Sequence, residues 1–131
     1  MAELTEEQKK ALENFDPKKP LVVNCAEIDA FKDIVGRFVC KRPTVQDRIN
    51  IGIAAAKERG GSDKLDNFLE NLIYILNTLE VVVTEKPAGV VFRELNDFDG
   101  IFELYGRYDR WLECFRLSVQ RSEGDAGVSS K

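Results

Sequence analysis

Acidic residues gather where the last part of the chain is expected to form a helix. Asp97 and Asp99 stand shortly before Glu103, and carboxylate oxygens are the ligands that hard metal ions prefer. The first turn of a helix also favours acidic side chains, because the helix dipole places positive charge at that end. We adopt this second explanation and predict no metal site here.

A glycine-rich segment in the middle of the chain is a candidate anion site. Gly60, Gly61 and Ser62 could bind a phosphate if a helix began there, since its first backbone N–H groups would be free. No basic motif accompanies them, and the chain contains neither GxxxxGK[ST] nor GxGxxG. A turn that ends one helix before the next begins is the better explanation.

The residues needed for most catalytic chemistry are missing. The chain has no His, which excludes Ser-His-Asp and Cys-His catalysis and His-ligated zinc. Its three cysteines, Cys25, Cys40 and Cys114, are widely spaced and form no C-x-x-C motif, which argues against a zinc ribbon, a redox dithiol and a disulfide framework. The sequence therefore predicts a protein that is not an enzyme, with no catalytic residues, no metal and no cofactor.

The composition is that of one globular domain. The chain has 131 residues, of which 44% are hydrophobic and 32% charged, and its net charge is −4. No apolar run approaches the roughly 18 residues of a membrane span, and the segment 1–10 is charged, unlike a secretory signal. We expect a cytoplasmic protein with reduced thiols.

Hydrophobic periodicity predicts three principal helices, near residues 44–59, 63–83 and 97–120. Capping boxes are expected at Thr5 with Gln8 and at Thr44 with Asp47. Gly60 and Gly61 should end the first principal helix, and the second should be capped by Ser62 or Asp63.

Two β-branched segments, residues 21–25 and 34–41, predict a small β-hairpin. The fold class is therefore mainly α (α+β): a three-helix bundle with a short N-terminal helix and this hairpin. We divide the chain into an N-terminal helix and linker (1–20), a single helical domain (21–121) and a disordered tail (122–131). The exposed edge of the hairpin leaves homo-oligomerisation open.

The predicted core consists of the apolar residues that recur on one side of each helix. Its members are Ile49, Ile53, Leu69, Leu72, Leu76, Leu79, Phe102, Tyr105, Leu112 and Phe115.

Two features are candidates for binding a partner. The last helix carries two neighbouring apolar stripes, of which Leu104, Tyr108, Trp111 and Phe115 form the one that could face another protein; burial of both stripes in the core is the alternative. Basic residues, including Arg42 and Arg48, dominate the segment 37–64. Because the net charge is negative and the following helix is nearly all apolar, a solvated helix face or an acidic protein partner fits this segment better than DNA.

The order of short motifs resembles the tail assembly chaperones encoded among the tail genes of long-tailed bacteriophages and prophages. The resemblance covers about residues 37–115 and is carried by Lys-Arg-Pro-Thr-x-x-Asp-Arg (41–48), Ile51-Gly52, the Gly-Gly turn, Leu65-Asp66, Thr78-Leu79, Lys-Pro-x-Gly (86–89), the Leu-x-x-Phe-Asp motif and Leu-Tyr-x-x-Tyr-x-x-Trp-x-x-x-Phe (104–115). It implies an assembly factor that binds the tape measure protein, helps to recruit tail tube protein and works in the host bacterial cytoplasm, with no membrane or nucleic acid partner.

Two other functions stay open at this point. The chain could be a structural tail-completion or connector component that remains in the virion. A small DNA-binding regulator is the other alternative, since residues 44–80, which overlap the basic segment, could form a helix-turn-helix.

Overall fold

The computed structural model describes residues 4–13, 15–60 and 66–129. The chain divides into two compact units, one made of the residues up to Lys19 with those from Arg107 onward, and one made of Pro20–Gly106. The helix α4 (Asp99–Ser129) runs through both units. Each unit is described by itself below.

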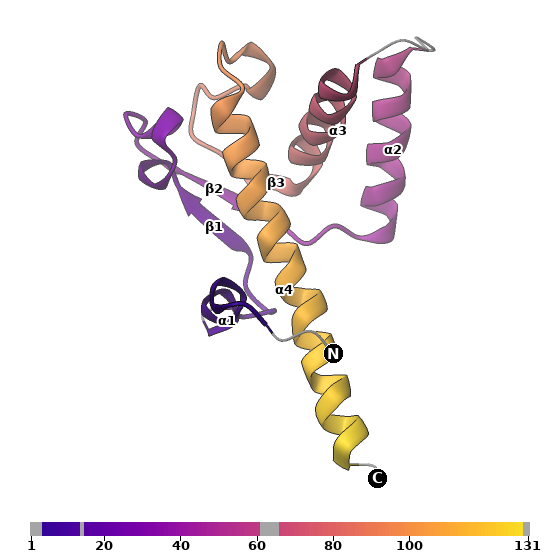
Figure 1. Ribbon diagram of the computed structural model, residues 1–131. Helices are drawn as coiled ribbons and strands as arrows, with labels where there is room; N and C mark the ends of the chain where they lie inside the picture. Colours follow the sequence, from indigo (N-terminus) through magenta and orange to yellow (C-terminus); the bar gives the residue numbers. More distant parts are fainter. Residues whose placement is uncertain (1–3, 14, 61–65, 130–131) are drawn as a thin grey trace. The chain divides into compact units, whose positions relative to one another are not determined.

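The fold is mainly helical α+β, with four α-helices and one small antiparallel sheet among the described residues (Figure 1). The helices are α1 (Glu6–Glu13), α2 (Val45–Arg59), α3 (Asn67–Val82) and α4. The strands are β1 (Leu21–Asn24), β2 (Arg37–Cys40) and β3 (Val83–Glu85). The short 3-10 turns η1 (Cys25–Glu27) and η2 (Asp29–Phe31) lie between β1 and β2, and η3 (Phe92–Glu94) lies between β3 and α4.

The sheet has three strands where the sequence predicts a hairpin of two. β1 and β2 pair as expected, with Leu21 opposite Cys40 and Asn24 opposite Arg37. β3 adds to the other side of β2, with Cys40 opposite Val83. Of the three consecutive valines 81–83, the first two end α3 and Val83 begins β3, so β2 is a central strand rather than an exposed edge.

The local signals at the helix ends are largely confirmed. Thr5 and Gln8 form a capping box, with the Gln8 N–H donating to Thr5 Oγ1 at 3.1 Å. Thr44 and Asp47 form the same motif at α2, and Gly60 ends that helix with φ 64° in the left-handed region. The α3 N-cap is Asp66, whose side chain accepts from the Leu69 N–H at 2.8 Å; the predicted caps Ser62 and Asp63 lie outside the described residues.

The last helix is longer than predicted. α4 continues to Ser129, where the sequence predicts a disordered tail from residue 122. No proline follows Asp99 to interrupt the helix, and its glycines weaken a helix without ending it.

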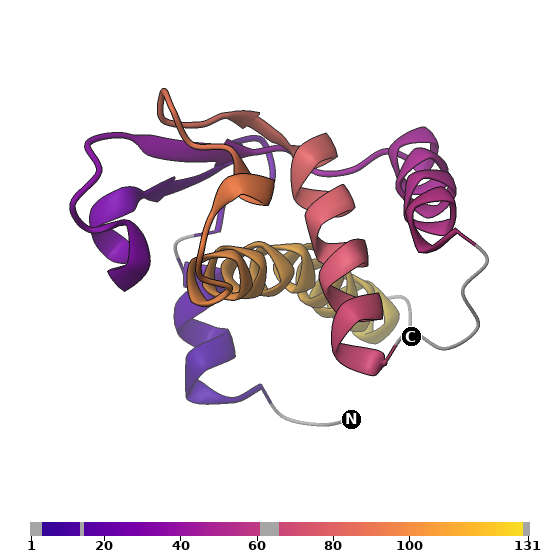
Figure 2. The same ribbon diagram turned by 90° about the horizontal axis from the view of Figure 1, so that it is seen from above.

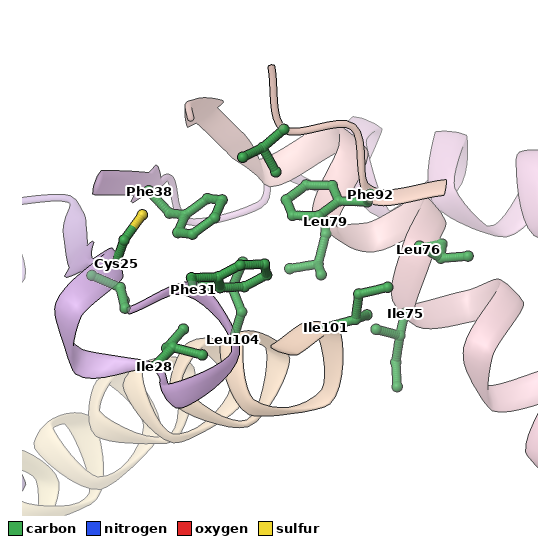
Figure 3. Packing of buried hydrophobic residues seen from close by; sticks show 12 residues of the cluster. Cys25, Ile28, Phe31, Phe38, Ile75, Leu76, Leu79, Phe92, Ile101 and Leu104 are labelled. Carbon is green, nitrogen blue, oxygen red and sulfur yellow. The ribbon is translucent and has the colours of Figure 1, made fainter. Parts of the chain in front are cut away.

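The core of the Pro20–Gly106 unit lies where α3, the sheet and the start of α4 meet. Figure 3 shows Leu79 from α3, Phe38 from β2 and Leu104 from α4 within one cluster, together with Phe31. The aromatic rings of Phe31 and Phe38 lie 5.2 Å apart between their centroids. The buried members of the cluster are Val23, Cys25, Ile28, Phe31, Phe38, Ile75, Leu76, Leu79, Val90, Phe92, Ile101 and Leu104.

Several predicted core residues are not buried. Ile49, Ile53 and Leu69 have 49%, 51% and 41% of their surface exposed, so their assignment to the core is wrong. Leu76, Leu79 and Phe115 are buried as predicted. Leu72, Phe102, Tyr105 and Leu112 are half-buried.

α4 and η2 approach each other so closely at Gly100 that a larger side chain would not fit there without a shift. A Cβ atom at Gly100 would lie 2.7 Å from Phe31 Cζ and 3.0 Å from Ala30 Cβ. Phe31 is buried and packed against Phe38, so its ring has little room to move.

We therefore expect Gly100→Ala to lower the free energy of unfolding by about 1–3 kcal/mol through overpacking. Gly106→Ala is the matched control on the same helix, because a Cβ atom there would meet no described atom within 4 Å beyond the backbone of its own helix. The control should raise stability by about 0.5–1 kcal/mol through helix propensity. Urea denaturation of both variants measures the difference, and equal effects would contradict the proposed close packing.

Candidate protein-docking surface

The outer face of α2 is apolar and open to solvent. Val45, Ile49 and Ile53 recur at intervals of four residues and are 76%, 49% and 51% exposed. Gly52 and Ala56 lie on the same side of the helix and are at least partly exposed. We call Val45, Ile49, Gly52, Ile53 and Ala56 the α2 stripe. Such a regular row of exposed β-branched side chains is unusual for a helix that has no partner.

α2 packs against α3 through the side that carries Ile51 and Glu58, and Gly52 and Ala56 at the border of the α2 stripe line a groove between the two helices. Figures 1 and 2 show α2 next to α3 and on the side of α3 away from the start of α4. Ile51 is 3% exposed, and Glu58 lies two turns later on the same side and contacts Asn77 of α3. The periodicity of the sequence therefore locates the apolar side of α2 correctly. It is wrong in placing Ile49 and Ile53 of that side in the core.

A charged network fixes this orientation. Arg93 in η3 donates two hydrogen bonds to Glu58, from Nη1 to Oε2 at 2.6 Å and from Nη2 to Oε1 at 2.9 Å. The same guanidinium binds Glu80 of α3 through Nε at 2.9 Å. Asn77, which is buried, donates to Glu58 Oε1 at 2.9 Å. Arg93 thus connects α2, α3 and η3, and we call these four residues the Arg93 network.

The network shifts the pKa values of its members. Hydrogen bonds from Arg93 are the main cause that lowers the pKa of Glu58 below its ordinary 4.5, since they favour the carboxylate. The two carboxylates in turn raise the pKa of Arg93. Both partners stay charged at neutral pH.

The beginning of α2 is fixed by a second set of polar contacts. The Thr44 N–H donates to Asp47 Oδ2 at 2.9 Å, and Lys41 Nζ lies 3.2 Å from the same oxygen. The backbone hydrogen bond from Thr44 is the main cause that lowers the pKa of Asp47. Both acidic residues of α2, Asp47 and Glu58, therefore bind cationic partners within their own unit.

A groove of about 330 Å³ lies between α2 and α3 beside the α2 stripe. Its α2 wall consists of small residues and one cation, and its α3 wall includes a tyrosine that is 47% exposed. The lining residues are Gly52, Ala55, Ala56, Arg59, Glu70, Asn71, Ile73 and Tyr74. Arg59 and Glu70 approach to 3.8 Å. No described atom lies within 4 Å of the place that a Cβ at Gly52 would take, so the groove is open there.

A second group of exposed rings lies at the beginnings of α3 and α4. Phe68 contacts Phe98 with ring centroids 5.3 Å apart and Phe102 at 5.7 Å. Phe68 and Phe98 are 46% and 48% exposed. These rings contact one another edge to face or at a tilt, so part of each ring is covered within the unit.

The aromatic stripe predicted to bind a partner does not form an open face. Leu104 is fully buried in the core cluster, and Tyr108 and Phe115 are 1% and 7% exposed. For these three residues the structure shows burial, the alternative that the sequence leaves open, and not a face exposed to a partner. Trp111 is half-buried, and its ring centroid is 5.0 Å from that of Phe115.

Phe115 also contacts Phe15 edge to face at 4.8 Å, within the unit that contains both chain ends. The short segment after α1 therefore covers a ring that the sequence alone leaves without a partner.

Both basic residues predicted to bind a partner, Arg42 and Arg48, are exposed. Arg42 precedes α2, and Arg48 lies in the first turns of α2 beside the α2 stripe. Sequence reasoning missed the stripe itself as a site. The signal that could have revealed it is Ile51 with Ala54 and Ala55, a smaller apolar side opposite the stripe that suffices to pack α2 onto a neighbour.

The cysteines offer no reactive thiol. All three are buried and free. Burial raises the pKa of Cys40 to about 12 and also raises the pKa of Cys25 and of Cys114. Since the thiolate is the nucleophile, these side chains are unsuited to covalent chemistry at neutral pH.

No protein-family model matches this chain, and no curated protein or solved structure is significantly similar to it. In the part of the chain that the structure describes, no group of three His, Cys, Asp or Glu residues could hold a metal ion. None of the helices formed by these residues has the length and apolar character needed to cross a membrane.

The pKa shift of Glu58 gives a test of the Arg93 network. A carboxyl with a lowered pKa in the folded state stabilises the fold above its unfolded pKa and loses this contribution as the pH falls through the folded value. We expect Glu58→Gln to reduce stability at about pH 7 by less than about 1 kcal/mol, because the ion pair is one-third exposed and screened by solvent. The difference from wild type should vanish toward about pH 3.

The measurement is urea denaturation across this pH range. Glu94→Gln, an exposed change in the same turn as Arg93, is the control and should leave the profile unchanged. A constant difference between Glu58→Gln and wild type at every pH would contradict the proposed role of the carboxylate.

Proposed function

We propose that this protein is a non-enzymatic assembly factor of the phage tail assembly chaperone type. It binds and solubilises the tape measure protein and helps to recruit tail tube subunits in the host bacterial cytoplasm. The exposed α2 stripe is the observation that carries this proposal, since it is an apolar surface that belongs to no core. The motif order over residues 37–115 supplies the particular client.

The physical requirements of such a client support the assignment. A tape measure protein is a long helix with apolar stripes, which aggregates when those stripes are uncovered. Its binder needs an apolar surface held on a stable scaffold and enough charge to remain dispersed. The α2 stripe lies on a helix fixed by the Arg93 network, and the chain carries a net charge of −4.

The proposal requires a tape measure gene in the same tail gene cluster, and co-expression with the product of that gene is the direct test. Wild-type protein should keep the tape measure in the soluble fraction, and Ile49→Glu with Ile53→Glu should reduce the soluble amount to that seen without the chaperone. Both side chains are about half exposed, so the double variant should remain folded, which circular dichroism checks.

Val35→Glu is the matched control, because Val35 is 99% exposed and lies outside α2. It should solubilise the tape measure as well as wild type does. Equal solubilisation by the double variant would remove the α2 stripe from the proposal. Mass spectrometry of mature particles separates an assembly factor, which departs, from a connector, which remains.

A further inference from the structure

The charged residues that α2 itself places beside the α2 stripe are all cations, and Glu70 of α3 lies across the groove, 3.8 Å from Arg59. On a helical projection, Arg48 and Arg59 lie along one side of the stripe and Lys57 along the other. The two acidic residues of α2 face inward and bind Lys41 and Arg93. Within the described part of the chain, Arg48 and Lys57 have no ion-pair partner. The outer surface of α2 is therefore an apolar row between cationic borders.

We propose that this surface docks an amphipathic helix of another protein, whose apolar stripe has acidic residues on both sides. One bulky side chain of that helix enters the groove over Gly52 and Ala56. The inference rests on the proposed function in taking a helical client, and it specifies the client's charge pattern and point of entry.

Charge complementarity selects this occupant over a second copy of the chain. If two α2 stripes packed against each other, Arg48, Lys57 and Arg59 of one copy would approach the same cations of the other. Like charges placed opposite one another oppose association, whereas acidic borders on a partner helix would pair with Arg48 and Lys57, the two cations without an ion-pair partner among the described residues. The cations also steer an acidic partner toward the stripe before contact.

The shape of the surface argues against a membrane. A helix that lies in a lipid interface buries bulky Trp, Phe or Leu side chains. The α2 stripe instead contains valine, isoleucine, glycine and alanine, and a groove with the polar pair Arg59 and Glu70 opens beside it. Small residues beside a concavity are suited to receive a side chain from a partner.

The test uses two labelled helical peptides of about 20 residues. Both carry the same leucine stripe, and they differ in having Glu or Lys along its borders. Fluorescence anisotropy with the full-length protein should show at least about tenfold tighter binding of the Glu-bordered peptide, and the preference should weaken as salt rises. The double variant Arg48→Glu with Lys57→Glu should reverse the preference.

Gly52→Leu tests the groove without harming the fold. Leucine favours helix more than glycine does, and the space at Gly52 is open. The variant should be at least as stable as wild type but bind the Glu-bordered peptide about tenfold more weakly. Val35→Glu should bind like wild type.

Three results would overturn the inference. The first is equal binding of both peptides, and the second is unchanged peptide binding by Gly52→Leu. The third is that the protein shows no preference between the peptides and instead binds vesicles of anionic phospholipid or forms a dimer. In that case Ile53→Glu should abolish the vesicle binding or the dimer. If the peptide results are as expected and the tape measure still aggregates, the proposed function fails and this inference stands. If the tape measure is solubilised and the peptides bind equally, the reverse holds.

Discussion

The placement of α2 depends on one guanidinium. Arg93 binds Glu58 of α2 with two hydrogen bonds and Glu80 of α3 with others, while its own backbone belongs to η3. A single exposed ion pair contributes little to stability. Here one planar cation holds carboxylates from two helices, and Asn77 adds a buried donor to the same Glu58 oxygen that Arg93 Nη2 contacts. Geometry of this kind specifies orientation even where it adds little free energy. It determines which side of α2 faces α3 and leaves the α2 stripe to solvent.

The helix α3 makes this arrangement possible, because it supplies the core on its other side. Its second half is buried and carries Leu76 and Leu79 into the cluster with the sheet and the start of α4. None of the residues of α2, all of which the structure describes, belongs to that cluster. α2 is attached by Ile51, small residues and the polar network rather than by a large apolar contact. The α2 stripe can therefore remain exposed, because the core cluster is complete without it.

The sequence predicts local features well because each depends on a few adjacent residues. The capping boxes at Thr5 and Thr44 and the left-handed Gly60 follow from hydrogen bonds within one turn. The third strand is not predicted because Val83 can end a helix or begin a strand, and pairing with Cys40 decides between them. Periodicity shows that α2 and α4 each have an apolar side, but it cannot show what covers it. Contacts distant in sequence, such as Arg93 with Glu58 and Phe115 with Phe15, make that choice.

Because the core and the proposed docking surface consist of different residues, the surface can change without loss of the fold. A residue of the core is constrained by packing against many neighbours, so changes there affect folding first. Val45, Ile49 and Ile53 have about half or more of their surface exposed, so a change to them alters what the helix can bind while the Arg93 network continues to hold it. Gly52 is constrained differently: its φ is not in the left-handed region and nothing crowds it, so the fold alone gives no reason for glycine at this position. Glycine lowers helix stability at an exposed position, and under the proposed docking this cost has a use, because the side chain of the partner helix takes the space above Gly52.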